Sequence, residues 1–212
     1  MEDKSKFSKL REQQRETRKN LIIDAAEMVF MKKHFNEVSI RKIAKEAGIT
    51  PTSIYRYFPD KQHLFCAAYE RDAQKLLKVV AEAIGDGKEL KIEELSMKYI
   101  EFFRKYSQSF KILANFTIDE AISEDCTIMV NLVTRPIIDQ VERYFKNFQP
   151  DIDARVLARS YFAAINGVLI SYQKYPGKSE DQIWGHMRVI AGAISKIFTC
   201  YLEKNATKGK VE

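Results

Sequence analysis

The chain has 212 residues, enough for one or two modest domains, and its 45% hydrophobic and 30% charged residues are close to the average for a globular protein. This composition excludes a disordered chain, a collagen-like polymer and a disulfide-knotted miniprotein. No apolar run approaches the ~20 residues of a membrane-spanning helix, and the charged N-terminus has no signal core. We therefore expect a cytoplasmic protein with no membrane partner.

The three cysteines, Cys66, Cys126 and Cys200, are widely spaced and form no C-x-x-C pair. An odd number at such spacing is typical of buried thiols in a reducing cytosol rather than of disulfides or a zinc site. We expect no metal and no other cofactor.

Helical periodicity dominates the chain, with only 8 Gly and 5 Pro, and no stretch alternates apolar and polar residues as a strand would. The pattern predicts an all-α fold of about nine helices. These are expected near Arg18–Lys33, Ile40–Ala47, Pro51–Phe58, Asp60–Ile84, Ile92–Tyr106, Ser109–Ile122, Glu124–Phe148 (bent or broken at Pro136), Ile152–Tyr175 and Glu180–Lys204.

Residues 39–58, SIRKIAKEAGITPTSIYRYF, have the spacing of a helix–turn–helix. Ser39 is a candidate N-cap for a short helix that stops at Gly48, where a turn needs positive φ. Thr50 caps the second helix, and Pro51 takes its first position, where a missing N–H does no harm. Small Ala44 would let the two helices cross closely. The residues expected to fill the wedge between them are Ile49, Ile54 and Phe58.

In a helix–turn–helix the second helix enters the DNA major groove, so the exposed polar and aromatic residues here are candidate DNA contacts. Ordinary surface polarity on a helical corner is the alternative. The candidates are Ser39, Arg41, Thr50, Pro51, Thr52, Ser53, Tyr55, Arg56, Tyr57 and Lys61.

Positive charge is concentrated in the same region. Residues 1–63 hold 14 Lys and Arg against 9 Asp and Glu, so they carry most of the net charge of +6. Such a region favours a polyanionic partner, although a solvated helical surface would also explain it. We interpret residues 1–17 as a basic arm that lies along the minor groove or neighbouring phosphates, with a disordered solubilising tail as the alternative.

Residues Arg18–Tyr69 resemble the N-terminal domain of the tetracycline-repressor (TetR) family of bacterial transcription regulators. The motifs IIDAAEMVF, VSIRKIAKEAGIT, SIYRYF and PDKQHLF carry this resemblance. The family usually has Gly where this chain has His34, so the turn after the first helix is expected to be built differently. The resemblance implies a helix–turn–helix domain at residues 18–63 and a helical ligand-binding and dimerisation domain at residues 64–212.

The two long closing helices are rich in apolar residues. In the resembling family these helices form the homodimer, and a two-fold dimer requires a palindromic operator. A monomer core closed by the same stripes is the alternative. The predicted interface residues are Ala163, Gly167, Ile183, Met187, Ile190 and Ile194.

The family also implies a pocket for a small, often hydrophobic effector among the aromatic residues of the second domain, where most aromatics are otherwise plain core. Asn166 is the candidate polar contact, since a buried amide needs a partner. The predicted lining residues are Tyr99, Phe102, Phe103, Phe116, Met129, Phe162 and Asn166.

The chain contains no phosphate-binding glycine loop, no H-E-x-x-H and no G-x-S-x-G, so we expect no enzyme. The sequence favours a homodimeric DNA-binding transcription regulator, most simply a repressor, that a small effector releases from its operator. Two alternatives stay open. One is a DNA-binding regulator controlled by a protein partner, with no cavity. The other is a small-molecule-binding or catalytic helical protein with a relic helix–turn–helix.

Overall fold

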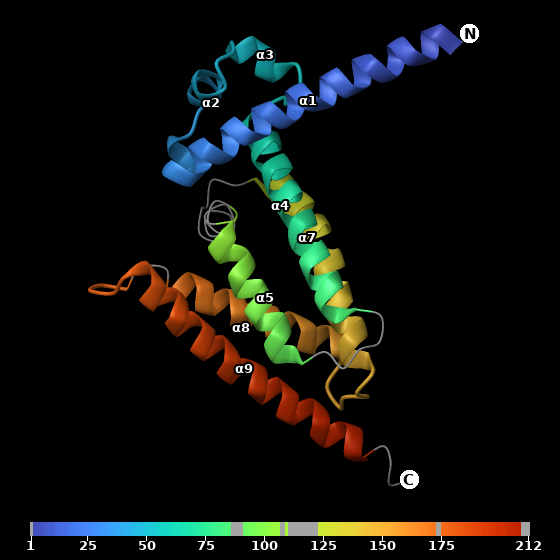
Figure 1. Cartoon of the computed structure of the whole chain (residues 1–212), viewed down its shortest axis with the longest axis vertical. Coiled ribbons are helices and arrows are strands. Elements are labelled where there is room, and N and C mark those ends of the chain that lie inside the picture. The colour runs from blue at the N-terminus through green and yellow to red at the C-terminus, as the bar shows by residue number, and fades with distance from the viewer. Residues whose placement is uncertain (1, 86–90, 107–108, 110–122, 173–174, 209–212) are drawn as a thin grey trace. The chain divides into compact units, whose positions relative to one another are not determined.

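The computed structural model describes residues 2–85, 91–106, 109, 123–172 and 175–208. Within these residues there are eight α-helices, one short 3-10 helix and no strand, which confirms the all-α class (Figure 1). The helix expected at Ser109–Ile122 falls almost wholly outside them. None of the described helices is both long enough and apolar enough to cross a bilayer.

The helices form two compact units. Unit 1 comprises Met1–Asp72 and Gln108–Val130, and unit 2 comprises Ala73–Ser107 and Asn131–Glu212. Two helices, α4 (Lys61–Ile84) and α7 (Glu124–Lys146), begin in unit 1 and continue into unit 2.

Unit 1 holds α1 (Glu2–Lys32), the 3-10 helix η1 (Phe35–Glu37), α2 (Ile40–Glu46) and α3 (Pro51–Tyr55), together with the starts of α4 and α7. Helix α2 packs against both α1 and α3. The start of α1 at Glu2 corrects the expected start at Arg18. Residues 2–17 contain no Gly or Pro and consist largely of Lys, Arg, Glu and Gln, which are good helix formers.

Three edge-packed phenylalanines anchor the core of unit 1. The Phe65 ring lies 5.1 Å from that of Phe30 and 5.2 Å from that of Phe35, both edge to face, and all three are almost fully buried. His34, between α1 and η1, has φ −63° and ψ 152°. This extended backbone needs no glycine, so the turn is built differently from the family's usual one, as expected.

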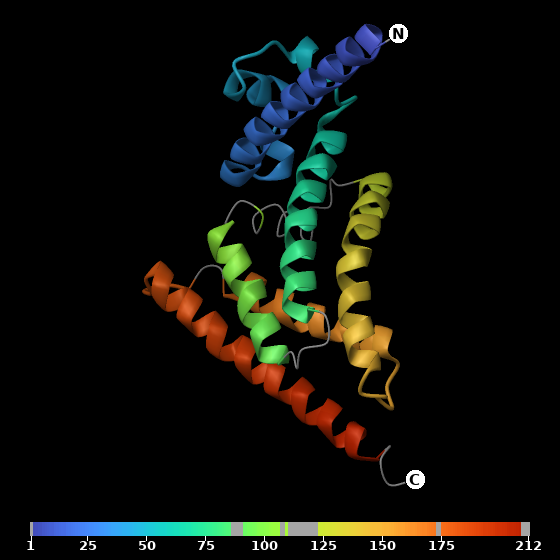
Figure 2. The same cartoon turned by 45° about the vertical axis from the view of Figure 1, so that its right-hand side comes forward.

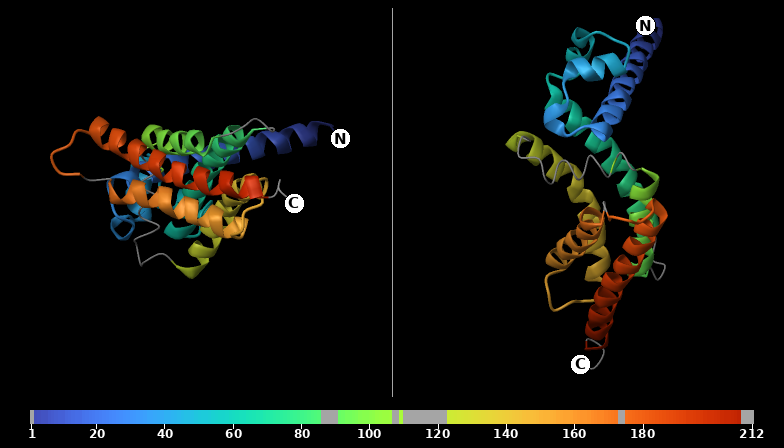
Figure 3. Two further views of the ribbon diagram at one scale, coloured as in Figure 1. Left: turned by 90° about the horizontal axis from the view of Figure 1, so that it is seen from below. Right: turned by 90° about the vertical axis from the view of Figure 1, so that its left-hand side faces the viewer.

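Unit 2 contains α5 (Ile92–Lys105), α8 (Ala154–Ser171) and α9 (Glu180–Lys208), besides the later parts of α4 and α7. Helix α9 packs along α5 and α8 (Figures 2 and 3). The helix was expected to be bent or broken at Pro136, and it is not broken, because α7 continues through this residue. Buried Ile137, Val141 and Phe145 hold the following turns, so packing compensates the hydrogen bond that proline removes.

A chain of hydroxyls crosses the core of unit 2. The Ser96 hydroxyl lies 2.7 Å from that of Tyr161 and 2.6 Å from that of Ser195, which also donates to the Ala191 carbonyl at 2.8 Å. All three hydroxyl-bearing residues are buried. Burial raises the pKa of Tyr161, which keeps its hydroxyl protonated as a hydrogen-bonding group. This chain fixes α5, α8 and α9 in register.

Candidate nucleic-acid interface

Two side-chain caps and one glycine build the corner formed by α2 and α3. The Ser39 hydroxyl accepts a hydrogen bond from the Lys42 N–H at 3.3 Å, and Thr50 Oγ1 accepts one from the Ser53 N–H at 3.3 Å. Between the helices, Gly48 has φ +66°, the left-handed conformation that the sequence predicted. Each of these local predictions is confirmed.

Buried residues hold this corner rigid. Ile43 and Ile54 are fully buried and Ala44 is 1% exposed, so α2 and α3 meet across a close-packed contact. Ile49 departs from the prediction. It is 38% exposed and does not fill the wedge. Since Gly48 turns the chain, the Ile49 side chain faces outward.

Most of the predicted DNA contacts lie on the face of the corner that points away from this buried contact. Arg41, Thr52, Tyr55 and Arg56 are exposed, and Tyr55 has 54% of its surface accessible. Neither arginine makes an ion pair with a described residue, so both guanidiniums are available to phosphate or guanine. The predicted contacts that are partly or fully exposed and lie on or next to the two helices are Ser39, Thr50, Pro51, Ser53 and Tyr57.

Lys61, the first residue of α4, is held more closely than the sequence suggested. Its Nζ donates to the Phe35 carbonyl at 2.8 Å and lies 4.0 Å from the centre of the Phe35 ring. The ammonium group therefore joins α4 to η1, and any phosphate contact would use its remaining N–H groups.

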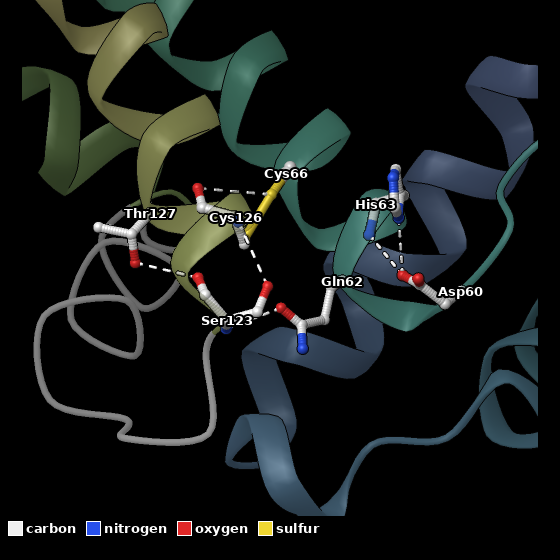
Figure 4. Close-up of a disulfide and its surroundings, with 7 residues drawn as sticks. All are labelled: Asp60, Gln62, His63, Cys66, Ser123, Cys126 and Thr127. Atoms are coloured by element: carbon white, nitrogen blue, oxygen red, sulfur yellow. Dashed lines mark hydrogen bonds and ion pairs between the residues drawn. A yellow bond between two sulfur atoms is a disulfide. The ribbon is translucent and has the colours of Figure 1, made fainter.

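Asp60 caps α4, as predicted. Its Oδ1 accepts hydrogen bonds from the His63 N–H and ring Nδ1, both at 2.9 Å (Figure 4). Partial burial raises the pKa of Asp60, but the hydrogen bonds and charge of His63 outweigh burial, so the net pKa is lowered. The first turn of α4 is thus held at two points, by the contact of Lys61 with Phe35 and by the Asp60 cap.

The start of α7 is attached to the same turn of α4. The Ser123 N–H donates to Gln62 Oε1 at 2.9 Å, and a disulfide joins Cys66 to Cys126 with 6.4 Å between the Cα atoms (Figure 4). The disulfide corrects the expectation of free thiols at these two positions, whereas Cys200 is free and exposed. Residues 60 apart in sequence pair here because tertiary packing of α4 on α7 brings them together, which spacing alone does not reveal.

We call the corner formed by α2 and α3 the recognition corner. A groove of about 340 Å³ lies beside it, between α1 and the α2–α3 segment. Leu21, Ile22 and Ile49 contribute apolar surface, and Arg18 and Arg56 bring two positive charges from opposite sides. The remaining lining residues are Ala47, Ser53 and Tyr57. Sequence reasoning missed this groove. The only hint was the outward-facing charge of Arg18 next to the apolar stripe of α1.

In unit 2 the structure brings together four of the residues predicted to line a ligand pocket. The Tyr99 ring lies 5.1 Å from that of Phe103 and 5.7 Å from that of Phe162, and the Tyr99 hydroxyl donates to Asn166 Oδ1 at 2.7 Å. Phe102 is buried and lies 5.1 Å from Phe103 by ring centres.

Two other predicted lining residues are not among the described residues of unit 2. Met129 belongs to unit 1 and is 39% exposed, whereas Phe116 lies outside the described residues. The structure thus places Tyr99, Phe103, Phe162 and Asn166 together within unit 2.

The predicted dimer residues have mixed accessibility within one chain. Ala163 is exposed and Met187 is buried in its own chain at 1% exposure. Partly exposed are Gly167, Ile183, Ile190 and Ile194. More exposed apolar residues of α8 and α9 lie outside the predicted interface set, namely Val156 (53%), Val189 (71%) and Ile197 (69%). Their outward orientation depends on which side of each helix faces the core.

Among the described residues, no group of three or more His, Cys, Asp or Glu is placed to hold a metal ion.

Residues 22–68 match the model of the family described as bacterial regulatory proteins, tetR family. The fold is similar to that of GusR from Salmonella enterica, with a TM-score of 0.70 and 21% identity over 87% of this chain and 95% of that one. It is also similar to a TetR-family transcriptional regulator from Streptomyces coelicolor, with a TM-score of 0.66 and 19% identity over 91% and 88% of the two chains. A third similar structure is the transcriptional regulator FadR from Bacillus subtilis in complex with stearoyl-CoA, with a TM-score of 0.69 and 16% identity over 82% and 96%.

The capped corner formed by α2 and α3 has the geometry of a helix–turn–helix with an exposed outer face. The match to the tetR family of bacterial regulatory proteins covers residues 22–68, which contain this corner, and the fold is similar to that of a TetR-family regulator.

Proposed function

We propose that this protein is a non-enzymatic, cytoplasmic repressor that binds a palindromic operator as a homodimer and leaves it when a small hydrophobic effector binds. The observation that carries the proposal is the exposed face of the rigid α2–α3 corner. There Arg41, Thr52 and Tyr55 project from a two-helix frame whose inner side is fully buried. Residues 18–63 are the DNA-binding domain in this proposal, and residues 64–212 bind the effector and form the dimer.

DNA recognition is tested by selecting bound duplexes from random DNA and measuring their affinity for variants. Tyr55→Ala and Thr52→Ala should each weaken operator binding by about 5- to 150-fold, because a base contact contributes about 1–3 kcal/mol of discrimination. Tyr175→Ala is the matched control, since Tyr175 is similarly exposed at 47% but lies in unit 2. Unchanged affinity in both corner variants would refute this use of the corner.

The apolar residues left exposed on α8 and α9 support the homodimer. Val156, Val189 and Ile197 are more than half exposed in the single chain, and a second copy of the chain would remove them from water. Val189→Glu combined with Ile197→Glu should give monomers in analytical ultracentrifugation. Ile128→Glu, which changes an equally apolar residue of α7 that is 51% exposed, should leave the dimer intact. A monomeric parent protein would refute the dimer.

The cluster of Tyr99, Phe103, Phe162 and Asn166 supports an effector site in unit 2, because apolar rings with one amide are typical of a site for a hydrophobic ligand. The FadR structure similar to this one holds stearoyl-CoA, so long-chain acyl-CoA is the first probe to test. An effector releases DNA only through its different affinity for the two arrangements of the regulator. Stearoyl-CoA and other candidate effectors are therefore added to the operator complex and its fluorescence anisotropy is followed. If every one of them left the complex intact at saturation, the release mechanism would fail while DNA binding stood.

A further inference from the structure

Helix α1 carries a stripe of arginines that leads away from the groove beside the recognition corner. Arg11, Arg15, Arg18 and Ile22 follow one another at spacings of four, three and four residues, which places them on one face of the helix. Arg18 and Ile22 line the groove, so the face of α1 that carries Arg11 and Arg15 is the continuation of the face that borders the groove. We call Arg11, Arg15 and Arg18 the arginine stripe.

The arginine stripe is exposed along its whole length, and none of its guanidiniums makes an ion pair with a described residue. Of the nearby acidic residues, Glu12 lies about 60° around the helix from Arg15 and Glu16 about 100° from it, and neither makes an ion pair with the arginine stripe. Lys6 and Lys9 lie on the opposite side of α1 by the same geometry. The guanidiniums of the stripe are therefore not paired with a carboxylate of a described residue and are open to an anionic partner.

The helical state of this segment determines which part of a duplex it can contact. An α-helix with its side chains is about 10–12 Å wide, whereas the minor groove of B-DNA is about 6 Å wide. A helical segment therefore cannot lie in the minor groove as an extended arm would. Phosphates on the outside of the duplex remain accessible to it, and Arg11 and Arg15 are separated by about 6 Å of helical rise.

We propose that the arginine stripe is a helical contact for the sugar–phosphate backbone of one DNA strand, continuing from the groove that Arg18 and Arg56 line. The inference rests on the proposed DNA-binding function and names a further contact of it. The positive charge of the stripe is complementary to a polyanion. Because the stripe is continuous with the recognition corner through the groove, that polyanion is the same DNA duplex that α3 contacts. The stripe contributes affinity without sequence information, because phosphates are the same in every duplex.

The test compares two double variants that remove equal charge from opposite faces of α1. Arg11→Gln with Arg15→Gln removes two members of the stripe, and Lys6→Gln with Lys9→Gln is the control. Affinity for a selected operator duplex and for a duplex of unrelated sequence is measured over a range of salt concentrations. Each phosphate contact contributes about 0.9 to the slope of log K against log salt, so the stripe variant should lower the slope by about 2 on both duplexes. The control should change it by less than 1.

Equal effects of the two double variants would overturn the stripe, because they would show a diffuse charge effect rather than a contact on one face. No effect in either would overturn it as well. Operator binding by the parent protein would persist in both cases, so the proposed function would stand. Failure of the parent to bind any duplex would instead overturn both.

A second pair of variants tests the helical form of the contact. Gln14→Pro breaks α1 between the groove and Arg11, whereas Gln14→Ala keeps the helix. The proline variant should lose about one unit of salt slope relative to the alanine variant, since Arg11 no longer follows the stripe. Equal slopes would show that the segment acts as a flexible arm and would overturn the helical contact.

Discussion

Arg71 of α4 provides the sharpest test of how α4 is attached to α1. Its Nη1 lies 2.6 Å from Asp24 Oδ1, while its Nη2 and Nε lie 2.6 and 3.0 Å from Glu27 Oε1. Burial alone would lower the pKa of Arg71, but the hydrogen bonds and charges of the two carboxylates raise it overall. Glu27 is only 8% exposed, so its charge is largely removed from water and this guanidinium compensates it. Arg71→Met removes the guanidinium and keeps most of the apolar stem.

The expected loss in the free energy of unfolding follows from how deeply each partner of the ion pair is buried. Removing one partner of a fully buried pair costs about 3–5 kcal/mol, because the other charge stays buried without compensation. The Asp24 side chain is 60% exposed, so its half of the interaction contributes little. The Glu27 half, at the edge of the core, sets the loss at about 2–3 kcal/mol. For a protein of this length that loss corresponds to a fall in Tm of roughly 5–10 °C.

Thermal and urea unfolding followed by circular dichroism would measure this loss. Arg143→Met is the control, because Arg143 is exposed and should change stability by less than about 0.5 kcal/mol. Combining Arg71→Met with Glu27→Gln should recover part of the stability, since the buried charge that lost its guanidinium is then gone. A loss below about 0.5 kcal/mol in Arg71→Met, or a double variant no more stable than the single one, would refute the reasoning.

Three further outcomes are expected. Asp60→Ala should cost about 1 kcal/mol through the lost cap of α4. Because the pKa of Asp60 is lowered in the folded protein, this contribution is present above its ordinary value of 3.8 and lost as the pH falls through the lower folded value, so parent and variant should converge in acid unfolding. Replacing both Cys66 and Cys126 by Ala should lower stability by up to about 4 kcal/mol for the 60-residue separation, and reductant should lower the Tm of the parent but not of that variant. Ser96→Ala should cost about 1–3 kcal/mol by leaving the buried Tyr161 hydroxyl without this partner, and Tyr161→Phe in the same chain should cost less than the sum of the two changes in calorimetry.

Much of the recognition corner could be predicted because its signals are local. Ser39, Thr50 and Asp60 cap their helices through hydrogen bonds from residues three positions later. Gly48 has a positive φ, which glycine adopts more easily than any other residue. A spacing of three residues is visible in the sequence, and its chemistry changes little with the rest of the fold. The outward-facing Arg41 and Tyr55 followed from the same periodicity.

The predictions that failed, or that the sequence left open, depend on partners far away in the chain. Ile49 was expected in the wedge, yet it faces the groove because α1 contributes the opposite wall. Lys61 meets Phe35 across 26 residues, and Cys66 meets Cys126 across 60. Periodicity indicates that such a residue lies on a given helix face, but it does not say which other helix covers that face.

The order of residues alone determined the helical class, the two short capped helices and the concentration of positive charge in the first third of the chain, because each depends on neighbours within a few positions. Only tertiary packing decided the groove between α1 and α3, the attachment of α7 to α4 and which apolar residues of α8 and α9 stay in contact with water. Those features arise when separate helices bury their faces against one another, and the free energy that selects one pairing over another belongs to contacts between residues distant in sequence.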